Sequence, residues 1–135
     1  MTIQANVRWV KDLQFIGRAG EGPGVVIDSA KGASGATPME LLLMGVAGCT
    51  AIDVVLIMEK KRAQLTNFEV NITGQQAATE PQRYTAIDIE YVLTGANIKP
   101  KGVEQAIALS EEKYCSALAS INASVTHSYR IESVE

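Results

Sequence analysis

Cysteine, histidine and aromatic residues are scarce in this chain of 135 residues. It contains 2 cysteines and 1 histidine, and aromatic residues make up 5% of it. So few cysteines exclude the disulfide framework that staples small secreted proteins. Together with the histidine they fall short of the four ligands that a structural zinc site needs. No phosphate-binding loop or dinucleotide fingerprint is visible, so the sequence predicts neither a metal nor a cofactor.

Positive charge is also limited. The chain has 12 Lys and Arg against 15 Asp and Glu, a net charge of −3, which argues against nucleic acid as a partner. No apolar run lies within Met1–Val10, so we expect no signal peptide and predict a cytoplasmic protein. In such a reducing compartment, two cysteines suit a redox-cycling pair, or two inert buried thiols, better than a permanent disulfide.

The remaining composition is that of an ordinary globular protein. Hydrophobic residues make up 47% and charged residues 20% of the chain. A chain of this length buries a core without disulfides or metals. We therefore predict a single domain over residues 1–135.

A long apolar run, Leu41–Met58, is the most unusual feature of the sequence. It is long enough to cross a membrane, but Asp53 lies within it, and a carboxylate at the bilayer centre costs about 2.5–3.5 kcal/mol. We therefore predict no membrane association. A helix that is apolar nearly all round must be covered on every side, which favours an intimate homodimer in so short a chain.

The start of this helix has strong local signals. Thr37 is a candidate cap, Pro38 suits the first turn, and the acid Glu40 faces the positive end of the helix dipole. We expect the helix to continue to about Arg62. Inside it, Gly45 and Gly48 each cost about 1 kcal/mol relative to alanine, so a close neighbour is expected beside them.

Alternating apolar residues predict strands elsewhere, and a second helix is expected over 100–114, with Ser110 and Tyr114 on the same side as its apolar residues. Arg18 lies in a glycine-rich segment, 17–24, which is expected to form a flexible loop. The predicted order is βββ-α-ββ-α-β, an α+β protein whose sheets wrap around two central apolar helices. The expected strands cover 3–9, 13–16, 25–28, 68–72, 87–93 and 125–131.

The two cysteines are the first candidates for chemistry. Cys49 is either a core cysteine or a nucleophile, and only its thiolate would attack a peroxide oxygen. A helix interior does little to stabilise a thiolate, so a cation is needed, and Arg18 is the natural one. Cys115 is either a second buried thiol or a resolving thiol that condenses with a sulfenic acid on Cys49.

Two segments resemble the OsmC/Ohr family of hydroperoxide reductases. The run from Thr37 to Cys49, with its proline and later cysteine, is similar to the active-site helix of that family, and Glu112–Cys115 resembles the segment around its second cysteine. The resemblance implies an intertwined homodimer with two active sites at the subunit interface. It also implies reduction of organic hydroperoxides by a peroxidatic Cys49 and a resolving Cys115 in stress defence, with a small or protein-bound dithiol as reductant.

The chain departs from the family pattern directly after the proline. Met39 stands where well-characterised members have a glutamate that pairs with the catalytic arginine, and Glu40 comes one residue later, rotated by roughly 100°. This departure resembles the divergent OsmC-like members. It leaves a second hypothesis open: a stress protein, or a dimer that binds apolar ligands, without peroxidase turnover.

Asp53 and His127 complete the set of candidates. Asp53 lies one helical turn after Cys49, either as a buried acid with a structural partner or as a group that orients Arg18 in place of the missing glutamate. A cation is expected near it, because an unpaired acid would raise the thiol pKa. His127 is interpreted as an ordinary packed or surface residue rather than a catalytic base.

Overall fold

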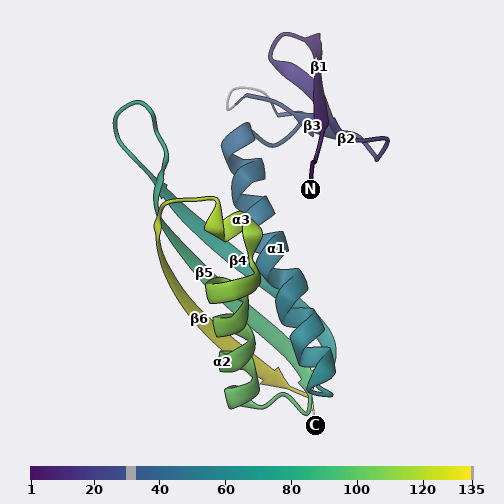
Figure 1. The fold of residues 1–135 in the computed structure, drawn as a ribbon, viewed down its shortest axis with the longest axis vertical. Coiled ribbons are helices and arrows are strands. Elements are labelled where there is room, and N and C mark those ends of the chain that lie inside the picture. The colour runs from purple at the N-terminus through teal and green to yellow at the C-terminus, as the bar shows by residue number, and fades with distance from the viewer. Residues whose placement is uncertain (30–32, 135) are drawn as a thin grey trace. The chain divides into compact units, whose positions relative to one another are not determined.

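The structure is a computed structural model that describes residues 1–29 and 33–134 (Figure 1). It divides into two compact units, Met1–Leu42 and Leu43–Glu135. The predicted order of strands and helices is confirmed, apart from additional short helical segments after the second helix. The prediction of an α+β protein is therefore confirmed: the described residues form two three-stranded sheets and one long helix. The single domain over 1–135 stays a prediction.

The first unit contains an antiparallel sheet in the order β1-β2-β3. Its strands are β1 (Ala5–Lys11), β2 (Gln14–Ala19) and β3 (Val25–Ile27). The apolar alternation that predicts a strand over 3–9 is typical of a half-buried strand, but every residue of β1 is exposed. The loop expected around Arg18 also needs correction. Arg18 lies within β2, opposite Asn6 of β1, and the turn follows it.

The helix α1 (Pro38–Lys60) begins with the cap that the sequence predicts. The backbone N–H of Glu40 donates to Oγ1 of Thr37 at 3.2 Å, and the backbone N–H of Thr37 donates to Oε1 of Glu40 at 2.8 Å. This reciprocal pair is a capping box. The helix ends slightly before the predicted Arg62, because Arg62 takes a left-handed conformation with φ 64° that closes the last turn.

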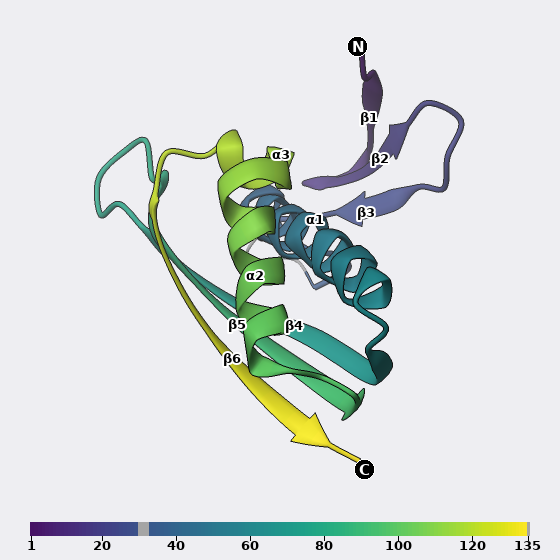
Figure 2. The same cartoon turned by 60° about the horizontal axis from the view of Figure 1, so that its bottom comes forward.

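The second unit is built on a sheet in the order β4-β5-β6. β4 (Gln64–Gln76) and β5 (Tyr84–Ala96) are antiparallel, whereas β5 and β6 (Ser124–Ser133) are parallel. Parallel neighbours need a crossover, which the second helical segment supplies. This segment and α1 lie over the same face of the sheet (Figure 2). The residues of β5 that are fully or almost fully buried include Ile87, Ile89, Tyr91 and Leu93.

The crossover is not the continuous α-helix expected over 100–114. It consists of α2 (Pro100–Leu109), a π-helical turn (Ser110–Tyr114) and the short α3 (Ser116–Ala119). In the π-helical turn the backbone N–H of Cys115 donates to the carbonyl of Ser110 at 2.7 Å. The wider turn changes the helical register. Ser110 is buried as expected, but Tyr114 is 50% exposed.

One side of α1 is apolar and exposed. Gly45, Gly48, Ile52 and Leu56 are spaced along one face of the helix, and we call them the α1 stripe. Within the described part of the second unit, nothing lies within 4 Å of the Cβ position of either glycine. The close neighbour predicted for these glycines is therefore not supplied by that unit.

By length and composition alone, α1 could also cross a membrane, and only 22% of its apolar window is buried. Its other side is a core surface, however, since Val46, Thr50, Val54 and Met58 are buried. The helix thus presents one covered apolar side and one uncovered apolar side.

Candidate active site

The two cysteines meet in the second unit, although one lies in α1 and the other between the π-helical turn and α3. Cys49 of α1 packs against a buried cluster formed by Val46, Cys115 and Leu118. Both cysteines are free thiols that pack in this one cluster, and Cys49 contributes to the raised pKa of Cys115. Thiol–disulfide chemistry requires two sulfurs that reach each other, and this arrangement provides them.

Cys115 is the more deeply placed of the two thiols, being only 3% exposed. Its Sγ accepts a hydrogen bond from the backbone N–H of Leu118 at 3.4 Å and so caps α3. Burial, followed by the hydrogen bond and the charge from Cys49 and the charge of Asp53, raises the pKa of Cys115 from 9.0 to about 11. The Leu118 hydrogen bond opposes this shift only in part. Cys115 therefore keeps its proton at neutral pH.

Cys49 is the more accessible thiol. It is half-buried, and it lies between Gly48 and the next exposed residue of the α1 stripe, Ile52. Met44, on the preceding turn, is 50% exposed. A molecule approaching Cys49 along this side of α1 therefore meets an apolar surface.

Asp53 lies one turn after Cys49, but its described partner is not the expected cation. Its Oδ2 accepts a hydrogen bond from Oγ of Ser110 at 2.9 Å. The same Ser110 Oγ lies 2.7 Å from Oγ1 of Thr50. Thr50 and Ser110 are both fully buried, so these hydroxyls form a polar connection inside an apolar core.

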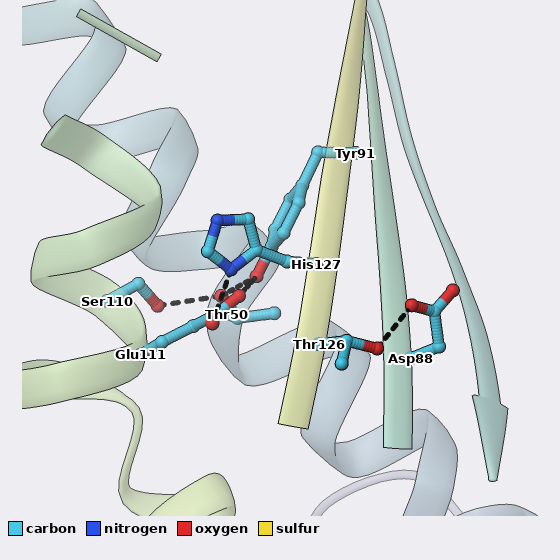
Figure 3. Close-up of polar contacts among 7 residues, drawn as sticks. All are labelled: Thr50, Asp88, Tyr91, Ser110, Glu111, Thr126 and His127. Atoms are coloured by element: carbon cyan, nitrogen blue, oxygen red, sulfur yellow. Dashed lines mark hydrogen bonds and ion pairs between the residues drawn. The ribbon is translucent and has the colours of Figure 1, made fainter. Parts of the chain in front are cut away.

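This polar connection continues to the surface (Figure 3). Oγ1 of Thr50 lies 2.9 Å from Oη of Tyr91, and that hydroxyl donates to Oε2 of Glu111 at 2.7 Å. The other oxygen of Glu111 lies 3.1 Å from Nδ1 of His127, whose side chain is 46% exposed. Burial raises the pKa of Tyr91 above its ordinary value, so its hydroxyl stays protonated at neutral pH. We call the series from Asp53 to Glu111 the hydroxyl chain.

In the first unit, Arg18 lies near a second arginine, Arg8. The two arginines lie on one face of the sheet and line a cavity of about 230 Å³ together with Asn6, Ile16 and Gly20. A guanidinium nitrogen of Arg18 passes so close to Gly24 that a Cβ there would lie 3.2 Å from it. Among the residues the structure describes, no ion pair joins either Arg8 or Arg18 to a carboxylate.

Glu40 has a structural task at the start of α1, where its carboxylate completes the capping box with Thr37. The ion pairs of the described ranges do not include one between Glu40 and Arg18. In the same ranges, no group of three or more His, Cys, Asp or Glu side chains is arranged to hold a metal ion.

Thr50, Tyr91 and Glu111 cannot be recognised as members of a site from the sequence alone. Ser110 appeared there only as a residue on the apolar side of a helix. The available signal was a hydroxyl on the buried side of each helical segment, at Thr50 and at Ser110. Buried polar groups need hydrogen-bond partners, so each hydroxyl indicated a polar contact inside the core. Their partners come from a strand and a π-helical turn that are distant in sequence, so the pattern alone does not connect them.

Residues 31–130 match the protein family described as OsmC-like protein. The chain belongs to this family. Protein YhfA of Escherichia coli K12 is 37% identical to it over 131 residues, which cover 96% of this chain and 98% of YhfA. Its name states no activity. The resemblance noted in the sequence is therefore confirmed at the level of the family.

Solved structures agree with this assignment. A hypothetical protein from Aquifex aeolicus has a TM-score of 0.90 and 28% identity, covering 100% of this chain and 99% of its own. The organic hydroperoxide resistance protein OhrB of Bacillus subtilis has a TM-score of 0.64 and 13% identity, with coverage of 96% and 98%. At this low identity, the comparison with OhrB shows only that the two proteins share a fold.

Proposed function

We propose that this OsmC-like protein reduces organic hydroperoxides by thiol chemistry, with Cys49 as the peroxidatic and Cys115 as the resolving cysteine. The observation that carries the proposal is the contact between two free thiols of unequal accessibility. The half-buried thiol is the one that a substrate reaches. The buried thiol, which stays protonated at neutral pH, is suited to wait for a sulfenic acid rather than to attack a peroxide itself.

The proposed reaction has two steps. The thiolate of Cys49 attacks the distal oxygen of ROOH, and the S–O bond of a sulfenic acid forms as the O–O bond breaks. The leaving alkoxide takes a proton from solvent and departs as ROH. The sulfur of Cys115 then attacks the sulfenic sulfur of Cys49. The S–S bond forms as the S–O bond breaks, and the hydroxide takes the proton of Cys115 and leaves as water. A small or protein-bound dithiol then reduces the disulfide, which returns both thiols.

Arg18 is the proposed cation for the thiolate and the peroxide oxygens. A guanidinium keeps its charge at every physiological pH and offers several donors in a fixed geometry. Two observations support the choice of this region: no described carboxylate neutralises Arg18 by an ion pair, and Arg8 adds a second positive charge at the same cavity. Asp53 and Glu40 have partners of their own in the hydroxyl chain and the capping box, so we assign neither a direct contact with the peroxide.

The proposed working form is a homodimer in the cytoplasm. The α1 stripe is apolar and uncovered within the second unit, and its two glycines permit close approach of another backbone. A second copy would cover this stripe and close an apolar pocket over Cys49, which favours an alkyl hydroperoxide over hydrogen peroxide. The cytoplasm suits this dimer, because thiols are kept reduced there and the proposed reaction needs both cysteines in the reduced form.

The decisive experiment is a single turnover with cumene hydroperoxide. One equivalent is added to the reduced wild-type protein, and free thiols and intact mass are measured. We expect rapid loss of both thiols with a mass decrease of two hydrogens. Cys49→Ser should consume no peroxide, whereas Cys115→Ser should consume one equivalent and accumulate a sulfenic acid that dimedone traps.

Two outcomes contradict the proposal. If both wild-type thiols remain free, the protein is not a peroxidase of this kind. If Cys49→Ser consumes peroxide as fast as the wild type, the peroxidatic cysteine is wrongly assigned.

A second function is favoured by one observation: Glu40, the acid nearest to the family's missing glutamate, is committed to the helix cap. An OsmC-like stress protein without that glutamate could use the apolar surface beside Cys49 to bind a ligand without turnover. Such a protein would leave both thiols free in the single-turnover experiment and would bind an apolar ligand saturably.

A further inference from the structure

Ser110 uses its side chain and its backbone to connect the two segments that carry the cysteines. Its hydroxyl donates to Oδ2 of Asp53 at 2.9 Å and lies 2.7 Å from Oγ1 of Thr50, and both of these residues belong to α1. Its backbone carbonyl accepts the N–H of Cys115 at 2.7 Å. Thr50 directly follows Cys49 in the chain, and Asp53 comes one turn later. Ser110 therefore links the helix that carries one cysteine to the backbone of the other.

The π-helical turn determines the side of the crossover on which Cys115 lies. Ser110 faces α1, and in a continued α-helix five further residues at about 100° each would rotate Cys115 by roughly 140° from that side. In the structure the turn is wider, because the N–H of Cys115 reaches back to Ser110 and not to Glu111. Cys115 instead packs in the buried cluster that Cys49 of α1 contacts. The wider turn thus brings the second sulfur to the side that faces α1.

Other contacts hold the neighbours of this link. The hydroxyl of Tyr91 donates to Oε2 of Glu111 at 2.7 Å and so fastens the second residue of the turn to β5 (Figure 3). The backbone N–H of Leu118 donates to Sγ of Cys115 at 3.4 Å, which is a contact within the start of α3. The first contact anchors the turn to the sheet and the second is local, whereas the contacts of Ser110 extend from α1 to Cys115.

The link made by Ser110 is also protected from solvent. Ser110 and Thr50 are both 0% exposed, so bulk water does not compete for the hydrogen bonds between them. A hydrogen bond in a water-poor core is electrostatically stronger than the same bond at the surface. Such a link is suited to hold the crossover at a fixed position against α1.

We propose that Ser110 is a positioning residue for the resolving step, which holds the backbone of Cys115 so that its sulfur stays within reach of Cys49. The inference rests on the proposed function, since it assigns a residue to the closing of the disulfide. We assign Ser110 no bond to the peroxide. It acts by raising the effective concentration of one thiol for the other, as a well-oriented pair of groups does in any intramolecular reaction.

The equilibrium of the protein with glutathione disulfide measures this effective concentration without any peroxide. The two cysteines lose two electrons and form their S–S bond, the S–S bond of glutathione disulfide breaks, and two reduced glutathiones leave with the two protons. The ratio of oxidised to reduced protein is read at fixed concentrations of both glutathione forms. We expect Ser110→Ala to lower the effective concentration about tenfold, which corresponds to about 1.4 kcal/mol, the size of one hydrogen bond.

The matched control is Ser120→Ala, which makes the same chemical change close to Cys115. The hydroxyl of Ser120 donates to the carbonyl of Ser116 at 2.9 Å, within the α3 segment and on the surface. Ser120→Ala should keep the effective concentration of the wild type. Far-ultraviolet circular dichroism and urea unfolding verify that each variant is folded. A merely structural role of Ser110 would lower the free energy of unfolding and leave the glutathione equilibrium unchanged.

A second set of variants reaches the same link from α1. The double variant Thr50→Val and Asp53→Ala removes both partners of the Ser110 hydroxyl and should lower the effective concentration as Ser110→Ala does. Adding Ser110→Ala to this double variant should lower it no further, because residues that act through one shared link have non-additive effects. Additive losses would show that Ser110 acts independently of α1 and would overturn the proposal.

Three further outcomes overturn the proposal: an unchanged effective concentration in Ser110→Ala, an equal loss in Ser120→Ala, or a wild-type protein that forms no internal disulfide with glutathione disulfide. In single turnovers with cumene hydroperoxide, Ser110→Ala should form the sulfenic acid at the rate of the wild type and close the disulfide about tenfold more slowly. A tenfold loss in the glutathione equilibrium of a protein that consumes no peroxide would reject the proposed function and support the positioning of the two thiols.

Discussion

The environment of Cys115 makes its protonation a determinant of stability at alkaline pH. Its pKa is raised from 9.0 to about 11 in the folded protein, chiefly by burial. Below pH 9 the folded and unfolded chains both hold the proton, and the contribution to stability is fully present. As the pH rises from 9 to 11, the unfolded chain loses the proton first, so the free energy of unfolding decreases.

This argument predicts a difference between the wild type and Cys115→Ser, a variant that keeps a side-chain acceptor for Leu118. The free energy of unfolding of the wild type should fall by about 2 kcal/mol more than that of the variant between pH 9 and 11. Urea unfolding with a reductant present measures both profiles. Parallel profiles would show that Cys115 does not resist ionisation.

At the residue scale, the sequence indicated Cys49 and Cys115 individually but gave no sign that they meet. Their contact depends on where a strand, a crossover and a π-helical turn place the second cysteine. Arg18 was assigned to a loop because glycines surround it, yet it lies in a strand. Gly24 lies close to this strand, since a Cβ there would lie 3.0 Å from a methyl of Ile16 and 3.2 Å from the guanidinium of Arg18.

At the scale of the element, the start of α1 separates a structural from a catalytic role for Glu40. Its carboxylate accepts from the backbone N–H of Thr37, and a glutamine at the same position can do so as well. We expect Glu40→Gln to leave peroxide consumption unchanged and Glu40→Ala to destabilise the protein by about 0.5–1 kcal/mol. Denaturant unfolding and single-turnover rates measure the two effects. A large loss of activity in Glu40→Gln would instead place this acid in the catalytic machinery.

The elements themselves were largely predictable, whereas their irregularities were not. Alternation identified β4, β5 and β6, and local capping signals placed the start of α1 within one turn. The π-helical turn has no signature in the sequence, because the same residues are compatible with a continued α-helix. This turn places Ser110 against Asp53 and Thr50, so the hydroxyl chain could not be predicted from the sequence either.

At the scale of the whole molecule, the sequence predicted that the long apolar helix is incompletely covered by its own chain. A run as apolar as Leu41–Met58 needs apolar partners on every side, and a single short chain has few to offer. The structure shows where coverage is missing: Ile52 is 64% exposed and Leu56 is 52% exposed. Such a continuous apolar face on a water-exposed helix is typical of a surface that another chain covers.

The proposed homodimer can be tested with one substitution in this face. Ile52→Glu introduces a charge at the centre of the α1 stripe, and burying an unpaired carboxylate there would cost more than the contact returns. We expect sedimentation equilibrium to give a dimer for the wild type and a monomer for Ile52→Glu. Lys60→Glu places the same side chain at an exposed position of the same helix and should remain a dimer. A wild-type monomer, or an Ile52→Glu dimer as stable as the wild type, would mean that the α1 stripe is not the interface, and the apolar pocket over Cys49 would then need a different wall.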